Sequence, residues 1–206
     1  MKLQLKKAAF GMMLIASCFF VSCNDDGTAD TTSDDSTNLA NNNANNNANN
    51  NADPGTSLNS GDRDFISDVM EGDMAEIRLA QLAQQKATSA EVKQVAKTLE
   101  TDHTASMNQL KDLASRKGVT APAEEDNDAK DRYENLSKKM GNEFDREWCE
   151  KVIDKHEKTI KNFENKSTDN NADADLKTWA AGMVPKLRTH HDQLMACHNK
   201  LKAMKK

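Results

Sequence analysis

The sequence is short of several features that would each point to a different class of protein. Its longest apolar run has about 14 residues, fewer than the roughly 20 that a membrane-spanning helix needs. Basic side chains are not in excess, with 28 Lys and Arg against 33 Asp and Glu, which argues against nucleic acid as a partner. No segment has the pattern of a β-strand, and no Ser or Cys stands beside a paired base. Nothing therefore indicates a sheet or nucleophilic catalysis.

The N-terminus has the pattern of a bacterial lipoprotein signal. Three Lys residues in Met1–Lys7 precede the apolar run at residues 8–21. The run ends in Phe20-Val21-Ser22-Cys23, which resembles the lipobox at which such signals are cut and the new N-terminal Cys is acylated. We therefore expect a signal peptide over residues 1–22 and lipidation of Cys23.

Two alternatives to this processing stay open. Cys18 follows Ile15-Ala16-Ser17, which fits the lipobox better, but cleavage there would leave Phe19-Phe20-Val21 exposed. The run could also remain as an uncleaved N-terminal anchor. In each case the folded domain lies outside the cytoplasm. Lipidation of Cys23 predicts a cell-envelope protein that is anchored to the outer membrane, facing the periplasm or the surface, with the membrane as its first partner.

Residues 23–60 have the composition of a disordered, Asn-rich tether. Almost every side chain from Asn24 to Ser60 is polar, and Asn repeats dominate the segment. Such a chain cannot bury enough apolar surface to offset the entropy lost on ordering. About 37 residues would hold the domain roughly 30–35 Å from the membrane.

Residues 61–206 have the spacing of amphipathic helices and predict a single all-α domain. Apolar side chains recur at helical intervals over residues 62–86, 89–117, 142–166 and 173–204. A short amphipathic piece around Tyr133 to Met140 lies in the long connection between the second and third of these. Pro185 is expected to kink the last helix near Gly182. The pattern predicts a four-helix bundle with a short extra helix between helices two and three.

One ionisable side chain interrupts each apolar stripe near its middle. These residues are Glu76, His103, His156 and His190. Each stands three, four or seven residues from apolar neighbours on both sides, which points it inward on a 3.6-residue helix. Each also lies about 13 to 16 residues from the expected start of its helix, close to mid-bundle. The sequence therefore predicts one buried polar layer.

Such a layer needs partners, because burying several unpaired ionisable groups costs several kcal/mol, comparable to the stability of a domain. Two interpretations stay open. Imidazole and carboxylate groups are common metal ligands, so the layer could hold one zinc or copper ion. Alternatively, a hydrogen-bonded Glu–His cluster only sets the helix register. Asp102 either orients one of the imidazoles or is an ordinary solvated carboxylate. We expect His191 and His198 at the surface.

Two thiols are placed to meet between the last two long helices. Cys149 lies seven residues before His156, and Cys197 lies seven residues after His190. Because neighbouring helices joined by a short connection run antiparallel, both thiols lie two turns from the polar layer in the same direction. An oxidising compartment favours a disulfide if their Cα atoms come within about 7 Å. A pair of buried free thiols is the alternative.

Short motifs occur in all four expected helices. They are Gly72-Asp73-Met74-Ala75-Glu76, Asp102-His103 with Leu110, Phe144-Asp145-Arg146 with His156-Glu157, and Pro185-Lys186-Leu187-Arg188-Thr189-His190. Together they resemble the DUF4142 group of ferritin-like bacterial proteins, usually exported or membrane-associated, over about residues 62–201. The resemblance implies a ferritin-like bundle whose second and third long helices run parallel. It implies no activity.

The metal-ligand pattern departs from that of ferritin-like di-iron proteins. Those sites need four carboxylates and two His, with Glu-x-x-His on two helices. Glu100-Thr101-Asp102-His103 matches once, but the register places Glu100 on the flank of its stripe. Leu187 stands where a second motif would need Glu before His190. A mononuclear site with imidazole ligands, holding zinc or copper, fits better.

Two functions from different classes fit these features. The first is a non-enzymatic envelope lipoprotein whose bundle binds an envelope protein or glycan, or contributes to stress tolerance. The second is a metal-binding or redox bundle centred on the polar layer. The metal content of protein purified without an affinity tag distinguishes the two.

Overall fold

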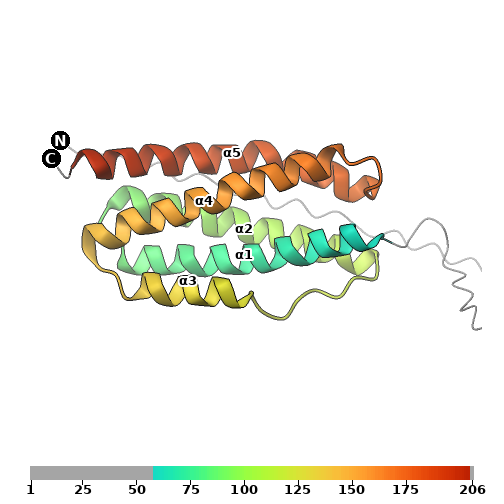
Figure 1. The fold of residues 1–206 in the computed structure, drawn as a ribbon, viewed down its shortest axis with the longest axis horizontal. Coiled ribbons are helices and arrows are strands. Elements are labelled where there is room, and N and C mark those ends of the chain that lie inside the picture. Colours follow the sequence, from blue (N-terminus) through green and yellow to red (C-terminus); the bar gives the residue numbers. More distant parts are fainter. Residues whose placement is uncertain (1–57, 205–206) are drawn as a thin grey trace, which may run out of the picture. The chain divides into compact units, whose positions relative to one another are not determined.

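The computed structural model describes residues 58–204 of the chain, and these form five α-helices and no β-strand. The helices are α1 (Ser60–Lys86), α2 (Ala90–Arg116), α3 (Asn127–Ser137), α4 (Gly141–Thr168) and α5 (Ala174–Ala203) (Figure 1). Within this part of the chain, no helix combines the length and the apolar character needed to cross a bilayer. The predicted signal peptide, Cys23 and nearly all of the tether lie outside the described residues.

The four long helices pair as two antiparallel hairpins. α1 packs along α2, and α4 packs along α5, while α1 against α4 and α2 against α5 join the hairpins (Figure 1). The long connection after α2 returns the chain to the opposite end of the bundle. α2 and α4 therefore run parallel, as the family resemblance implies. The predicted all-α four-helix bundle is confirmed.

The four long helices begin and end within a few residues of the predicted positions, and side chains cap the N-termini of α1, α2 and α5. Asn59 accepts a hydrogen bond from the backbone N–H of Asp62, and Ser89 accepts one from Val92. Asp173 accepts from the first turn of α5. α5 continues through Pro185 without a break in its assignment, and the predicted kink stays a prediction.

The short helix is not where the sequence pattern placed it. α3 spans Asn127–Ser137 rather than the region from Tyr133 to Met140. Asp126 accepts a 2.6 Å hydrogen bond from the backbone N–H of Ala129, and this cap starts the helix six residues earlier than expected. Met140, counted as part of the apolar pattern, is 77% exposed and only precedes α4.

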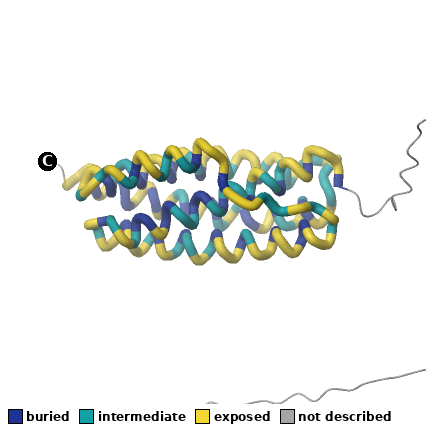
Figure 2. The backbone as a smooth tube through the Cα atoms, turned by 90° about the horizontal axis from the view of Figure 1, so that it is seen from below, coloured by how far each residue is buried: buried dark blue, intermediate teal, exposed yellow. Residues whose placement is uncertain are grey.

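Buried positions recur along the long helices, while exposed positions lie on their outer faces (Figure 2). The core has apolar clusters toward each end of the bundle and a polar layer between them. One cluster centres on Trp148 and Phe144, and the other on Ile66, Leu110 and Leu176. The buried polar residues Asp73, Glu76, His103, Ser106, His156 and His190 fall between them in the sequence of each helix. The bundle thus gathers three buried imidazoles and two buried carboxyl groups in one layer between the apolar clusters.

Asp145 holds the two hairpins together near one end. This carboxylate is fully buried on α4 and accepts hydrogen bonds from the Thr88 backbone N–H (3.0 Å), the Thr88 hydroxyl (2.6 Å) and the Ser89 backbone N–H (2.8 Å). Because it joins the turn before α2 to α4, it helps set the height of His103 relative to His156.

Candidate metal centre

Three histidines from three different helices meet in the polar layer. His103 comes from α2, His156 from α4 and His190 from α5, and each is at most 5% exposed. Their ring centroids are 5.5 Å apart in all three pairs. One nitrogen from each ring lies within 4.8 Å of one nitrogen from each of the others. Three imidazoles therefore surround one point in the middle of the bundle.

Hydrogen bonds on the outer side of two rings determine which nitrogens carry protons. His156 Nδ1 lies 3.0 Å from the carbonyl oxygen of Val152, which can only accept, so Nδ1 is the donor. His190 Nε2 lies 2.9 Å from Asp102 Oδ2, and the same argument makes Nε2 the donor. In the neutral rings, His156 Nε2 and His190 Nδ1 then carry lone pairs. These two nitrogens face each other across 3.4 Å.

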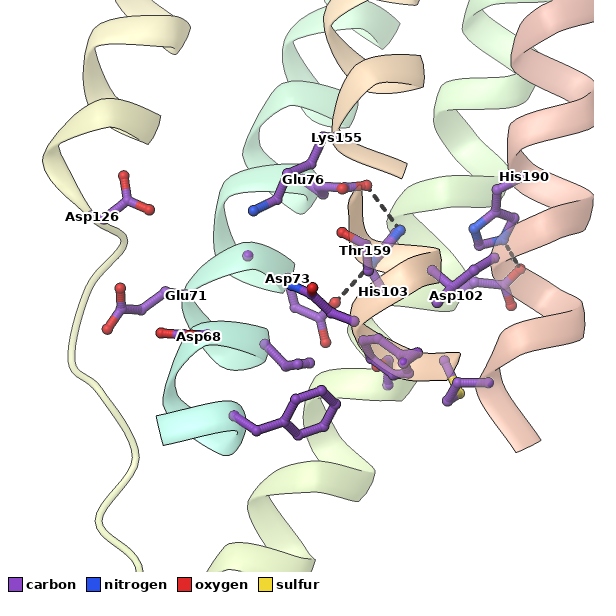
Figure 3. A pocket seen from close by; sticks show the side chains of 18 residues that line it. Asp68, Glu71, Asp73, Glu76, Asp102, His103, Asp126, Lys155, Thr159 and His190 are labelled. Atoms are coloured by element: carbon purple, nitrogen blue, oxygen red, sulfur yellow. Dashed lines mark hydrogen bonds and ion pairs between the residues drawn. The ribbon is translucent and has the colours of Figure 1, made fainter. Parts of the chain in front are cut away.

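His103 is held between two carboxylates of α1. Its Nδ1 lies 2.7 Å from Asp73 Oδ1, and its Nε2 lies 3.0 Å from Glu76 Oε2 (Figure 3). The second contact is close but lacks the angles of a hydrogen bond, so Glu76 Oε2 and His103 Nε2 both lack a hydrogen-bond partner. Glu76 Oε2 also lies 3.5 Å from His156 Nδ1. Glu76 therefore touches two of the three imidazoles and lies outside the compact trio.

Burial and charge give the three imidazoles different protonation states. Burial opposes protonation of His103, but the charges of Glu76 and Asp73 outweigh it and raise its pKa to about 10. Burial lowers the pKa of His156, and it lowers the pKa of His190 to about 4. Without a metal ion, His103 is an imidazolium at neutral pH while the other two rings are neutral and carry free lone pairs.

The two buried carboxyl groups also differ. Burial raises the pKa of Asp73, although the hydrogen bond with His103 acts against this. Burial opposes ionisation of Glu76 as well, but the adjacent His156 and His103 lower its pKa to about 2. Glu76 is thus the group in the layer that keeps its negative charge throughout the physiological range.

Asp102 lies beside His190, on the opposite side of the cluster from α1. It accepts a hydrogen bond from His190 (Figure 3). It also lies 3.2 Å from the ammonium of Lys186. Burial opposes ionisation of Asp102, yet these two partners lower its pKa. Although Asp102 precedes His103 in sequence, the ring that it orients belongs to α5.

Asp73 is the residue of this site that the sequence pattern did not single out. It performs for His103 what Asp102 performs for His190, and it is 5% exposed. The sequence could have identified Asp73 as a site residue, because it stands three residues before Glu76 and so shares its helical face. Glu100 is half-buried and pairs with Gln81 and Gln84, away from the cluster, as its flanking position indicated.

The prediction that His198 lies at the surface is wrong. The residue is 7% exposed, because it stands four residues after Leu194 and three before Leu201, both of them buried. His191 is half-buried, between Glu157 and Asp192. Neither residue joins the three histidines of the polar layer.

A cavity of about 200 Å³ opens beside the cluster (Figure 3). Its buried end is lined by His103, His190, Asp73 and Glu76, and apolar side chains including Phe163 form part of its wall. Its outer end reaches exposed carboxylates of α1 and of the α2–α3 connection. His156 does not line this cavity and closes the cluster from the far side.

The two thiols lie in contact between α4 and α5. Cys149 and Cys197 are both buried and are free thiols in this structure. Their mutual hydrogen bond and burial raise the pKa of Cys149. The disulfide between them stays a prediction.

Comparisons with known proteins agree with the sequence pattern and the fold. The sequence profile described as "Domain of unknown function (DUF4142)" matches residues 46–197. No curated protein matches the chain. Among solved structures, the crystal structure of a DUF305 fragment from Deinococcus radiodurans is similar, with a TM-score of 0.62 and 12% sequence identity. The match covers 70% of this chain and 99% of that one, and at this identity it shows a shared helical fold.

Proposed function

The chain belongs to the DUF4142 family, whose description assigns no activity, and we propose that its bundle binds one transition-metal ion between His103, His156 and His190. The observation that carries this proposal is the pair of lone-pair nitrogens that face each other across 3.4 Å. Two acceptors repel at this distance unless a cation lies between them. For metal–nitrogen bonds of about 2.0–2.1 Å, a tetrahedral site separates its nitrogens by roughly 3.3–3.4 Å.

The partners on the outer side of each ring support the same conclusion. Imidazole ligands of metals almost always donate their other N–H to a carboxylate or a backbone carbonyl, which orients the ring. Here Asp73, Asp102 and the Val152 carbonyl occupy these three positions. His156 and His190 are thereby held with Nε2 and Nδ1 facing each other, and His103 Nε2, which lies 3.0 Å from Glu76 Oε2, is the nitrogen left to join them.

The donor set favours zinc or copper. Three imidazoles suit both ions once His103 releases its second proton to solution on metal binding, and the trio lacks the carboxylates of a di-iron site. Glu76 is the anionic donor nearest to the centre, and its Oε2 has no hydrogen bond to lose on moving to a metal. It would supply the fourth ligand or hold a metal-bound water. We place this site in a non-enzymatic envelope lipoprotein, because the sequence before residue 24 carries the lipobox pattern.

The test is the metal content of protein purified without an affinity tag, followed by titration with zinc and copper after removal of bound metal. We expect about one equivalent per chain and a thermal midpoint that rises with metal, since 100-fold excess over Kd stabilises by about 2.7 kcal/mol. His103→Ala and His156→Ala should each abolish most of the binding and of the rise. Each substitution should lower the thermal midpoint less in metal-free buffer than in the presence of metal.

His191→Ala is the matched control, because this neighbouring imidazole lies outside the cluster and its side chain is 23% exposed. It should bind metal as the wild type does. If the wild type retains no metal, and the two cluster variants lose equal stability with and without added ions, the layer is a hydrogen-bonded cluster that only sets the helix register.

A further inference from the structure

We infer that the cavity beside the histidine cluster is the route by which a hydrated divalent cation reaches the site and leaves it again. This inference rests on the proposed metal site and concerns its exchange with solution. It makes the bundle a carrier that loads and unloads, in contrast to a protein with a permanently enclosed structural ion.

The cavity connects the buried layer with exposed residues of α1 and of the α2–α3 connection. At its inner end are His103, His190 and Glu76, which are 5%, 2% and 6% exposed. At its outer end are Asp68 and Asp126, which are exposed, and Glu71, which is half-buried (Figure 3). Its volume of about 200 Å³ admits an ion with its first shell of roughly six waters, at about 30 Å³ for each water.

Unsatisfied polar atoms at the inner end point to a ligand. Asp73 Oδ2, Glu76 Oε2 and His103 Nε2 are buried and have no hydrogen-bond partner. All three residues are more than nine-tenths buried and line this cavity. His103 Nε2 and Glu76 Oε2 lie 3.0 Å apart as an ion pair that lacks hydrogen-bond geometry. A buried polar atom without a hydrogen bond costs about 1–3 kcal/mol, so three such atoms in one cavity indicate an occupant that bonds to them.

The charge of the lining selects a cation. Six carboxyl groups line the cavity, those of Asp68, Glu71, Asp73, Glu76, Asp102 and Asp126. Lys155 is the one Lys or Arg among the described residues that line it, and its charge acts on Glu76. A cleft with charges of one sign and low-dielectric walls focuses the field and accelerates the arrival of the opposite ion by about 10- to 1,000-fold.

The rate of metal uptake tests this route separately from the affinity. Cobalt(II) serves as the probe, because its visible absorption changes when imidazole ligands replace water, and stopped-flow mixing with metal-free protein gives a second-order rate constant. In Asp68→Asn/Glu71→Gln/Asp126→Asn, this rate constant should fall about tenfold at low salt. The difference should shrink at 1 M salt, where the Debye length is about 3 Å. Binding should still reach one equivalent.

Two further variants sharpen the test. Lys155→Met keeps the length of the side chain but removes the one Lys or Arg charge among the described lining residues, and it should accelerate uptake several-fold. Asp112→Asn/Asp131→Asn/Glu150→Gln removes the same number of exposed carboxylates outside the cavity and should leave the rate unchanged.

The outcomes separate the two proposals. If the wild type binds cobalt but the cavity triple variant takes it up as fast as the control triple variant, the route is wrong and the metal site stands. If both triple variants slow uptake equally, the net charge of the protein sets the rate and the cavity lining does not. This outcome also overturns the route. If the wild type binds no cobalt, zinc or copper, both proposals fall.

Discussion

His156 and His190 face each other with Nε2 and Nδ1 only 3.4 Å apart, although each ring donates its proton to a partner on the opposite side. The two helices that carry them are joined by a short turn and pack along each other, so the approach is part of the fold. If the two neutral rings served packing alone, the repulsion between their lone pairs would be uncompensated. Four predictions follow from this arrangement and from the rest of the chain.

Asp73 should affect metal affinity without touching the metal. Removing a carboxylate that orients a ligand histidine typically costs 10- to 100-fold in affinity, so Asp73→Ala should weaken zinc binding by this factor. Asp73→Asn keeps an acceptor for His103, so its zinc affinity should lie between those of the wild type and Asp73→Ala. Competition with a chromophoric chelator measures the affinity. Asp64→Ala, an exposed carboxylate on the same helix, is the control, and an unchanged affinity in Asp73→Ala would show that His103 is oriented by other contacts.

The metal-free protein should lose stability on mild acidification. His190 has a pKa of about 4 in the folded protein, below the usual 6.5, so the unfolded chain takes up the proton first. The free energy of unfolding therefore falls as pH drops from 6.5 to 4, by about 3 kcal/mol from this residue. Burial of His156 acts in the same direction.

Among the other groups of the layer, the raised pKa of Asp73 acts in the opposite direction, because the folded protein takes up this proton at a higher pH than the unfolded chain does. His103 and Glu76 act mainly outside this pH window. The raised pKa of His103 gives a stability that is complete below pH 6.5 and is lost only as pH rises through about 10. The lowered pKa of Glu76 gives a stability present above pH 4.5 and lost toward pH 2. Urea unfolding between pH 4 and 7 in the presence of a chelator measures the effect. His190→Gln should flatten the profile, and an equally steep profile in that variant would assign the effect to other groups.

Cys149 and Cys197 should form a disulfide in the exported protein. Their thiols are in contact, and a bridge closing about 48 residues would stabilise the fold by roughly 4 kcal/mol in the chain-entropy model, less any strain. Mass spectrometry of non-reduced peptides from protein isolated from the envelope should show the linked pair. Two alkylatable thiols in the denatured, unreduced protein would exclude the bridge and leave a pair of buried free thiols.

Cys23 should carry the lipid anchor. Because acylation precedes cleavage at a lipobox, Cys23→Ser should leave an unprocessed precursor that incorporates no fatty-acid probe. Cys18→Ser should be labelled as the wild type is. Labelling that persists in Cys23→Ser and disappears in Cys18→Ser would move the anchor to Cys18. The mature protein should bind membranes firmly, since several acyl chains hold it more strongly than one.

The sequence by itself determined the all-α class, the four long helices and the inward direction of the four ionisable residues. These properties are local: a stripe of apolar residues at helical spacing defines both the helix and the face that it buries, as Leu187, His190 and Leu194 illustrate. The start of α3 was misplaced because a single capping side chain, Asp126, outweighed a weak apolar pattern.

Only the tertiary structure decided which residues meet. A helical stripe does not state the height or rotation of one helix against the next, so it could not show that Asp73 holds His103, that Asp102 orients His190 and that Glu76 stands outside the histidine trio. These contacts join residues 30 or 88 positions apart. They depend on how side chains from four helices pack together, which is a property of the assembled core and is absent from each helix alone.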